Sequence, residues 1–332
     1  METHPLVWFC ATGKTGLGHL RRCATIAKAL RRLAPGCCIG LATNATVAGL
    51  EPADIAAFTQ IEIVDRQSMA DRIAGRSNGP IVVDTAVLPG LATTNRPLVL
   101  ILRQTPEDRL ERFRLQDGRP WDLVMVPNPR ADWWPELDPD FAHRVEPVGW
   151  IYRGVPVSTR PLWLTPLVIV ASGGGATAPI AATWKAEVDP IIAHARALTD
   201  TPFYVAQALG PRAAPEAHLL HADDRFDPGG DLHLYFAQAD TVISTAGYNS
   251  VLELATTDVP ALLVAIPRSL DNQMARACLW GTRLGKWHVP GETLSSGAWL
   301  AAQIDAAKRR APWDLGPSGE TAAAQLILGL AQ

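Results

Sequence analysis

Short apolar runs alternate with amphipathic segments along this chain, and this alternation constrains the fold more than any other feature. In the first half, runs rich in Val, Ile and Leu lie at 6–10, 39–43, 61–64, 81–84, 98–102 and 123–126. Continuous apolar runs of this length are typical of strands buried on both faces of a parallel sheet. The segments between them, such as 20–33, carry apolar residues at helical spacing. The pattern predicts an α/β, Rossmann-like, doubly wound domain.

The same alternation begins again after a Pro- and Trp-rich stretch at 127–166. Further apolar runs lie at 167–171, 203–206, 241–244 and 261–266. A chain of 332 residues with 48% hydrophobic content can bury two cores. We therefore expect two Rossmann-like domains, at 1–155 and 156–332, with the last helix as a candidate to pack back on the first. A ligand between two such domains would meet the carboxyl ends of both sheets, in a central cleft.

Composition excludes several classes of function. The net charge of −3 gives no general attraction to nucleic acid. The five cysteines form no C-x-x-C pair and no zinc-ligand spacing, so we expect reduced thiols and neither a metal nor a cofactor. No apolar run approaches the ~20 residues of a membrane helix, and the first residues lack a basic region. We expect a cytoplasmic protein without a transmembrane segment, and leave a peripheral membrane contact open.

Residues 240–285 contain the most specific ligand signal. An expected strand at 241–244 ends at Ala246 and Gly247, and the next helix opens with Tyr248, Asn249 and Ser250. The first N–H groups of a helix, with the positive end of its dipole, form a site for an anion such as a diphosphate. Glu253 lies four residues after Asn249, on the same helix face, where its carboxylate can accept hydrogen bonds from a ribose diol. A phosphate site beside a diol site predicts a nucleotide.

The glycine-containing loop at 11–19 has two interpretations. Residues 8–15, WFCATGKT, miss the phosphate-loop pattern G-x-x-x-x-G-K-[ST] at its first glycine, where Trp8 stands. That interpretation makes Lys14 the phosphate ligand, and it places Gly16 and Gly18 inside a helix at a cost of about 1 kcal/mol each.

In the second interpretation, which we prefer, the sequence from Gly16 to His19 forms the turn itself and sets an imidazole at the start of a helix. A neutral histidine there can take a proton from an attacking hydroxyl. The alternative for His19 is a structural role, capping the helix or packing under the loop. Asp84 is also open between two roles, because a carboxylate at the end of a strand can reach a substrate or cap the following turn.

Two segments carry a resemblance to a known family. The segments GLGHLRRCATIAKAL and STAGYNSVLELATTDVPALLVAIP together resemble GT-B glycosyltransferases, near the MurG-type N-acetylglucosaminyltransferases. The first segment, with VVDT and the later VGWIYR, is also similar to PseG-type UDP-sugar hydrolases. The resemblance implies the GT-B fold, in which two Rossmann-like domains face a cleft, and a nucleoside diphosphate sugar as donor.

The family pattern also implies roles for particular residues of this sequence. Donor-binding roles fall on Gly174 and Gly175 in a cleft-lining loop, on Ser244, Gly247, Tyr248, Asn249 and Ser250 at the diphosphate, on Glu253 at the ribose, on Asn272 and Gln273 near the sugar, and on Arg153. His19 is the expected catalytic base, with Gly16 and Gly18 in its loop.

The expected reaction is an inverting, metal-independent transfer of a sugar from a nucleoside diphosphate sugar, with a UDP-sugar favoured, to a hydroxyl of an unidentified acceptor. The first alternative is a UDP-sugar hydrolase, in which His19 activates water. The second is a nucleotide-sugar binding protein without turnover, and the third is the phosphate-loop phosphotransferase that uses Lys14.

Overall fold

The chain forms two compact units. The computed structural model describes residues 7–13, 17–76, 79–153, 165–172, 178–210 and 213–331. The first unit comprises Met1–Tyr152 and Gly316–Gln332, and the second comprises Arg153–Leu315. The first unit therefore ends three residues before the expected boundary at 155, and it includes the end of the chain.

The first unit is built on a parallel sheet of seven strands in the order β3-β2-β1-β4-β5-β6-β7. Its strands are β1 (Val7–Ala11), β2 (Ile39–Thr43), β3 (Gln60–Ile63), β4 (Ile81–Asp84), β5 (Leu98–Ile101), β6 (Leu123–Val126) and β7 (Val145–Pro147). The inner strands β1, β2, β4, β5 and β6 are buried along their whole length. This burial explains why their sequences are continuously apolar.

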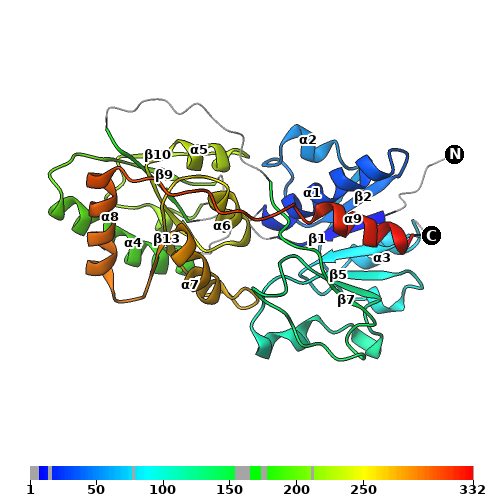
Figure 1. Ribbon diagram of the computed structural model, residues 1–332. Helices are drawn as coiled ribbons and strands as arrows, with labels where there is room; N and C mark the ends of the chain where they lie inside the picture. The colour runs from blue at the N-terminus through cyan, green and yellow to red at the C-terminus, as the bar shows by residue number, and fades with distance from the viewer. Residues whose placement is uncertain are drawn as a thin grey trace. The chain divides into compact units, whose positions relative to one another are not determined.

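Four α-helices belong to the described part of the first unit: α1 (Gly18–Leu33), α2 (Pro52–Ile55), α3 (Met69–Ala74) and α9 (Glu320–Gly329). The apolar face of α1 packs on the sheet, with Ile26 and Leu30 in one core with Phe9. The C-terminal helix α9 lies beside α1 and adds the buried Ile327 to that core (Figure 1). Residues far apart in the sequence thus share one core.

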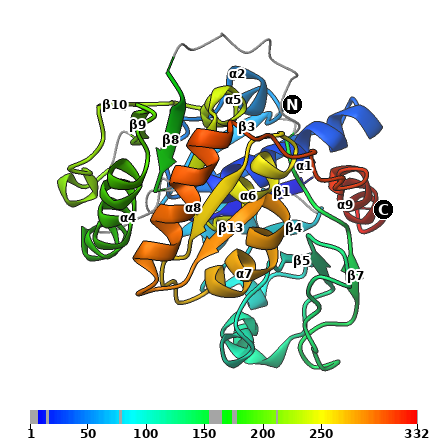
Figure 2. The same cartoon turned by 60° about the vertical axis from the view of Figure 1, so that its left-hand side comes forward.

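The second unit is built on a parallel sheet of six strands in the order β10-β9-β8-β11-β12-β13. Its strands are β8 (Leu167–Ala171), β9 (Tyr204–Ala208), β10 (Asp224–Phe226), β11 (Thr241–Thr245), β12 (Ala261–Val264) and β13 (Gly285–His288). Its helices are α4 (Ala178–Leu198), α5 (Leu232–Gln238), α6 (Tyr248–Ala255), α7 (Gln273–Leu284) and α8 (Thr293–Ala306). Figure 2 shows α8 beside α4.

Three short strands were not predicted from the sequence, and all three lie at sheet edges. These are β7 with sequence VEP, β10 with sequence DRF and β13 with sequence GKWH. Edge strands are less covered than central ones, so they do not need the continuous apolar pattern that marks buried strands. The charged segment Glu107–Phe113 forms a 3-10 helix with Leu110 and Phe113 buried.

Each sheet reverses its direction of strand order at one point, between β1 and β4 in the first unit and between β8 and β11 in the second. Ligands of doubly wound folds bind outside the carboxyl ends of the strands at such a point. Thr85 follows β4, Gly247 lies in the turn after β11, and His19 lies in the first turn of α1, the helix after β1. The topology therefore brings these residues to the edges of the sheets where ligands of such folds bind.

Among the described residues, no helix is both long enough and apolar enough to cross a membrane.

Candidate functional site

His19 lies in the first turn of α1, immediately after the loop that follows β1. The helix begins at Gly18, so Gly18 is its first residue and not part of the turn, which corrects the predicted turn from Gly16 to His19. The N-cap residue is Leu17, which makes no capping hydrogen bond through its side chain. The His19 side chain retains 21% of its exposure, so one side of the ring is accessible.

Asp84, at the end of β4, is the partner of His19. Its side chain is fully buried, and its Oδ1 atom lies 3.2 Å from Nδ1 of His19. Arg22, one turn along α1, approaches both carboxylate oxygens, with Nε 2.9 Å from Oδ2 and Nη2 2.6 Å from Oδ1. Asp84, at the end of β4, thus contacts two residues of α1, the helix that follows the neighbouring strand β1.

The electrostatics of this cluster favour a neutral imidazole. Burial lowers the pKa of His19, Asp84 partly offsets that effect, and the positive charges of Arg103 and Arg22 lower the pKa further. Burial by itself would raise the pKa of Asp84, but Arg22 and His19 outweigh burial and hold that pKa well below its usual range. An ionised carboxylate beside Nδ1 favours the tautomer with the proton on that nitrogen, which leaves Nε2 as the basic atom.

Thr85, directly after Asp84, adopts an unusual backbone conformation. Its φ of 45° lies in the left-handed region, which a β-branched residue rarely adopts. Its hydroxyl oxygen lies 2.9 Å from Ile101 O and 2.9 Å from Oδ1 of Asp84, so its single proton can be donated to either oxygen. Backbone strain of this kind costs on the order of 1–3 kcal/mol and persists where surrounding contacts hold it. Here those contacts also fix the carboxylate that faces His19.

In the second unit, the turn after β11 leads directly into α6. Gly247 is the N-cap residue, with an extended conformation of φ −65° and ψ 146° and no side-chain cap. Tyr248 is buried, whereas Asn249 and Ser250 are half-buried. Ser244 lies fully buried in β11, and its hydroxyl donates to Thr245 O at 3.1 Å. The Ser244 hydroxyl therefore has a hydrogen-bond partner within its own strand.

Glu253, on the buried side of α6, contacts Arg153. Its Oε1 atom lies 3.2 Å from Arg153 Nη2, and its side chain is 5% exposed. The same Nη2 lies 2.7 Å from Nδ1 of His233 and 3.2 Å from Gly230 O. Because arginine only donates, Nδ1 of His233 accepts. His233 was not among the predicted site residues, and its place beside two of them depends on the packing of α5 against α6.

Asn272 and Gln273 lie at the start of α7. The Asn272 side chain caps this helix, with its Oδ1 atom accepting from Ala275 N at 3.1 Å. Gln273 is buried, its amide nitrogen donates to Asp271 Oδ2 at 3.1 Å, and its amide oxygen accepts from Ile266 N at 3.3 Å. Both the nitrogen and the oxygen of the Gln273 amide thus form hydrogen bonds within the second unit. The helix cap formed by Asn272 involves its amide oxygen and not its amide nitrogen.

Several predicted residues lie outside the described part of the chain: Gly16 and Lys14 in the first loop, and Gly174 and Gly175 after β8. Trp8, however, is described, and it decides between the two interpretations of the first loop. It lies within β1 and is fully buried, so position 8 belongs to a strand and cannot open a phosphate loop. The phosphate-loop interpretation is wrong for this reason.

Asp138 and Asp140 have the D-x-D spacing by which two carboxylates can hold a metal ion. Asp138 instead forms an ion pair with Arg114, with Oδ2 2.5 Å from Nη2, and its Oδ1 atom accepts from Phe141 N at 2.7 Å. The Arg114 hydrogen bond lowers the pKa of Asp138. This carboxylate is therefore committed to the structure of its own loop.

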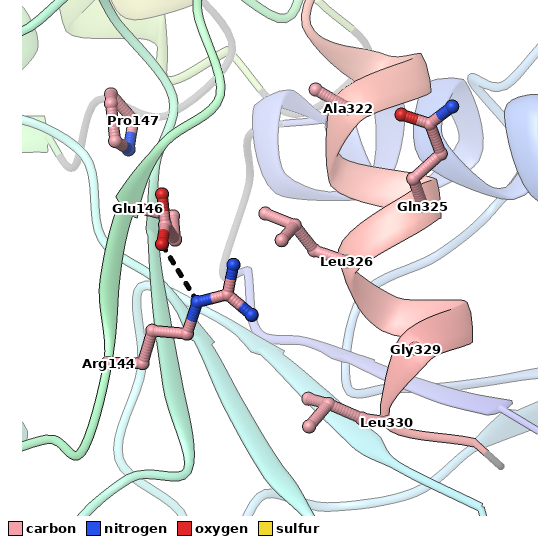
Figure 3. Close-up of a pocket in the computed structure, with 8 residues that line it drawn as sticks. All are labelled: Arg144, Glu146, Pro147, Ala322, Gln325, Leu326, Gly329 and Leu330. Carbon is pink, nitrogen blue, oxygen red and sulfur yellow. Dashed lines mark hydrogen bonds and ion pairs between the residues drawn. The ribbon is translucent and has the colours of Figure 1, made fainter.

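A pocket of about 390 Å³ lies between β7 and α9 in the first unit (Figure 3). Leu326 and Leu330 point toward it from the helix. On the opposite side Arg144 and Glu146 pair with each other, with Nε 2.8 Å from Oε1. None of the predicted site residues lines it, and its two charges neutralise each other. We therefore place the candidate site at the strand ends and not in this pocket.

Comparison with known proteins gives a family match within the second unit. Residues 191–312 match the family model of the glycosyltransferase family 28 C-terminal domain. This range contains the α6 turn, Glu253, Asn272 and Gln273. The chain is also 35% identical over 74 residues to the UDP-N-acetylglucosamine--N-acetylmuramyl-(pentapeptide) pyrophosphoryl-undecaprenol N-acetylglucosamine transferase of Pseudomonas paraeruginosa. That match covers 22% of this chain and 21% of the relative.

Solved structures resemble the whole chain at low identity. MurG of Acinetobacter baumannii has a TM-score of 0.55 and 16% identity, covering 97% of this chain and 99% of that one. A proposed UDP-N-acetylglucosamine 2-epimerase from Listeria monocytogenes has a TM-score of 0.57 and 13% identity, covering 98% and 95%. Sequence identity at this level establishes the fold, and the reaction has to be inferred from the residues of the site. The chain therefore has the two-unit α/β fold found in GT-B glycosyltransferases, and its residues 191–312 are similar to the glycosyltransferase family 28 C-terminal domain.

Proposed function

We propose that this protein is an inverting glycosyltransferase that moves a sugar from a nucleoside diphosphate sugar to a hydroxyl, with His19 as the base. The observation that carries the proposal is the contact of Asp84 with Nδ1 of His19, because it leaves Nε2 as the basic atom on a ring held neutral by burial. A neutral, oriented imidazole is what removal of a proton from an acceptor hydroxyl requires.

The donor is assigned to the second unit. Transfer leaves negative charge on the departing diphosphate, which the N–H groups at the start of α6 would stabilise. Glu253 is assigned to the ribose, and Arg153, 3.2 Å from it, adds a positive charge beside the donor. The N–H groups at the start of α6 and the Arg153 guanidinium would oppose the developing negative charge, so the proposal needs no metal ion. A uridine donor is favoured because the partly matching Pseudomonas relative is named for a UDP-sugar.

Hydrolysis of a UDP-sugar is the second candidate. The observation that favours it is the same His19 and Asp84 pair, which would activate water as readily as an acceptor hydroxyl. The two reactions differ in what a donor alone produces. A hydrolase releases free sugar without an acceptor, whereas a transferase turns the donor over slowly until an acceptor is present.

The test begins with thermal unfolding in the presence of uridine, thymidine and guanosine diphosphates and their sugars. A ligand at 100 times its Kd stabilises the fold by about 2.7 kcal/mol, which gives a clear shift in Tm. Donor sugars that bind are then incubated with and without candidate acceptors, and nucleoside diphosphate release is measured. His19→Ala should abolish turnover and retain donor affinity. If no nucleoside diphosphate or sugar shifts the Tm, the proposal fails.

A further inference from the structure

A buried arginine contacts the turn that leads into α6. Arg276, on α7, is 2% exposed. Its Nη1 atom donates to the carbonyl oxygen of Ala246 at 2.9 Å, and its Nη2 atom donates to Asp271 Oδ1 at 2.7 Å. A buried guanidinium is costly unless a charge and hydrogen bonds satisfy it. Asp271 supplies the negative charge, and the Ala246 carbonyl oxygen accepts a hydrogen bond from the other terminal nitrogen of the guanidinium.

Asp271 is itself held in place. Its Oδ2 atom accepts from the amide of Gln273, whose oxygen accepts from Ile266 N after β12. Asn272 between them caps α7. The loop from β12 to α7 is therefore a hydrogen-bonded frame around the Asp271 carboxylate. Through Arg276 this frame is connected to the backbone of a different loop, the one between β11 and α6.

The bond to Ala246 controls the orientation of one peptide plane. The peptide between Ala246 and Gly247 is planar and trans, as are the other described peptide bonds. In a trans peptide the C=O and the N–H point in opposite directions, so fixing the Ala246 carbonyl toward Arg276 turns the Gly247 N–H away from it. A rotated peptide would instead direct the carbonyl oxygen, a partial negative charge, away from Arg276.

We propose that Arg276 is a positioning residue for the donor diphosphate: it holds the Ala246–Gly247 peptide so that the Gly247 N–H faces the anion. The inference rests on the proposed function, which places the diphosphate at the start of α6. Arg276 itself is buried and does not touch the donor. Its effect is selective for ligands that carry phosphate, because a nucleoside without phosphate makes no use of this N–H.

The chain offers a matched control at the other end of the same helix. Arg310 donates to the carbonyl oxygens of Leu254 and Val259, near the end of α6. Burial lowers the pKa of Arg310 to about 10. Arg310→Met therefore also removes an arginine that holds backbone carbonyls beside α6, but far from the helix start.

The experiment compares Arg276→Met and Arg310→Met with the wild type by calorimetric titration of UDP and uridine, or of whichever nucleoside diphosphate and nucleoside the wild type binds. Loss of a hydrogen bond to a charged group weakens binding by about tenfold or more. We expect that loss for the diphosphate in Arg276→Met, with nucleoside affinity within about twofold of the wild type. Arg310→Met should retain both affinities.

Arg276→Lys provides a second variant if Arg276→Met fails to fold. Lysine keeps the positive charge, but its single nitrogen replaces the two nitrogens through which arginine bonds to Ala246 O and to Asp271. It should show the same selective loss to a smaller extent. Equal losses for diphosphate and nucleoside, wild-type binding by Arg276→Lys, or a selective loss in Arg310→Met would each overturn the inference. Failure of the wild type to bind any nucleoside diphosphate would instead overturn the proposed function and the inference with it.

Discussion

At the scale of single residues, the proposed chemistry depends on how Asp84 is held. Its two oxygens receive Arg22 Nε, Arg22 Nη2 and the Thr85 hydroxyl, and they face His19 Nδ1. Charge-assisted hydrogen bonds of this kind are among the stronger ones in proteins. The carboxylate therefore has a fixed position, and the imidazole takes its orientation from it.

The pH dependence of the reaction follows from these contacts. His19 must be neutral to accept a proton, and its lowered pKa predicts that the acid limb of kcat/KM has its midpoint below about 6.5, the ordinary histidine value. Asp84 raises that pKa and Arg103 lowers it. We expect Asp84→Asn to move the limb to lower pH and to reduce the plateau rate by about a hundredfold.

Arg103→Gln is the matched variant for that measurement. It removes a positive charge near His19, so the acid limb should move to higher pH. Both profiles are measured with the same donor and acceptor, and the unfolding of each variant is followed separately at every pH. If both limbs moved in the same direction, the proposed influence of these charges on His19 would be wrong.

At the scale of elements, the attachment of α9 depends on a glycine. Gly319 precedes the helix, and its N–H donates to Trp150 O at 2.8 Å. A Cβ atom at this position would collide with the carbonyl oxygen of Val148 and lie 2.7 Å from that of Gly149. The close approach of two backbones, and not an unusual dihedral angle, therefore requires glycine here, since φ is −75°.

We expect Gly319→Ala to lower the stability of the first unit by about 1–3 kcal/mol, the cost of forcing atoms into a packed contact. Gly329→Ala, at the last residue of the same helix, is the control, because a Cβ there meets nothing within 4 Å. That change should be neutral or stabilise by up to about 1 kcal/mol. Urea unfolding measures both. Equal stability of the two variants would contradict the proposed docking of α9.

At the scale of the whole molecule, we expect the two units to differ in their response to acid. The lowered pKa of Asp84 means that its contribution to stability is fully present above about pH 3.9, the ordinary value, and is lost as the pH falls from there through the folded-state pKa. Protonation of Asp84 weakens its pair with Arg22, which is in the first unit. The first unit should therefore unfold at progressively lower temperature below about pH 4.

Hydrogen exchange during thermal unfolding separates the two units and provides the measurement. Asp84→Asn should have a lower first-unit midpoint at neutral pH and a flatter dependence on pH below about 4. Asp305→Asn, an exposed carboxylate of the second unit whose pKa is lowered by hydrogen bonds from Thr199 and Thr201, should leave the first unit unchanged. A first-unit midpoint that falls as steeply in Asp84→Asn as in the wild type would exclude Asp84 as the source.

Much of the fold was predictable because it depends on local patterns. Ten strands were predicted from continuous apolar runs, which mark strands that a sheet covers on both faces. The edge strands β7, β10 and β13 lack that pattern and were missed. The whole-chain likeness to MurG and the family 28 match over 191–312 confirm the predicted fold and family resemblance. The assignment of individual site residues stays a prediction.

The sequence by itself determined the repeated alternation of strands and helices, the glycine turn before α6, and the place of His19 at the start of α1, because each depends on residues close together in the chain. Only the tertiary structure decided that Asp84 meets His19, that His233 meets Arg153, and that Arg276 reaches Ala246. These partners are 65, 80 and 30 residues apart, respectively. They meet because the order of strands in each sheet brings distant loops to one edge, and helical or strand periodicity contains no information about that order.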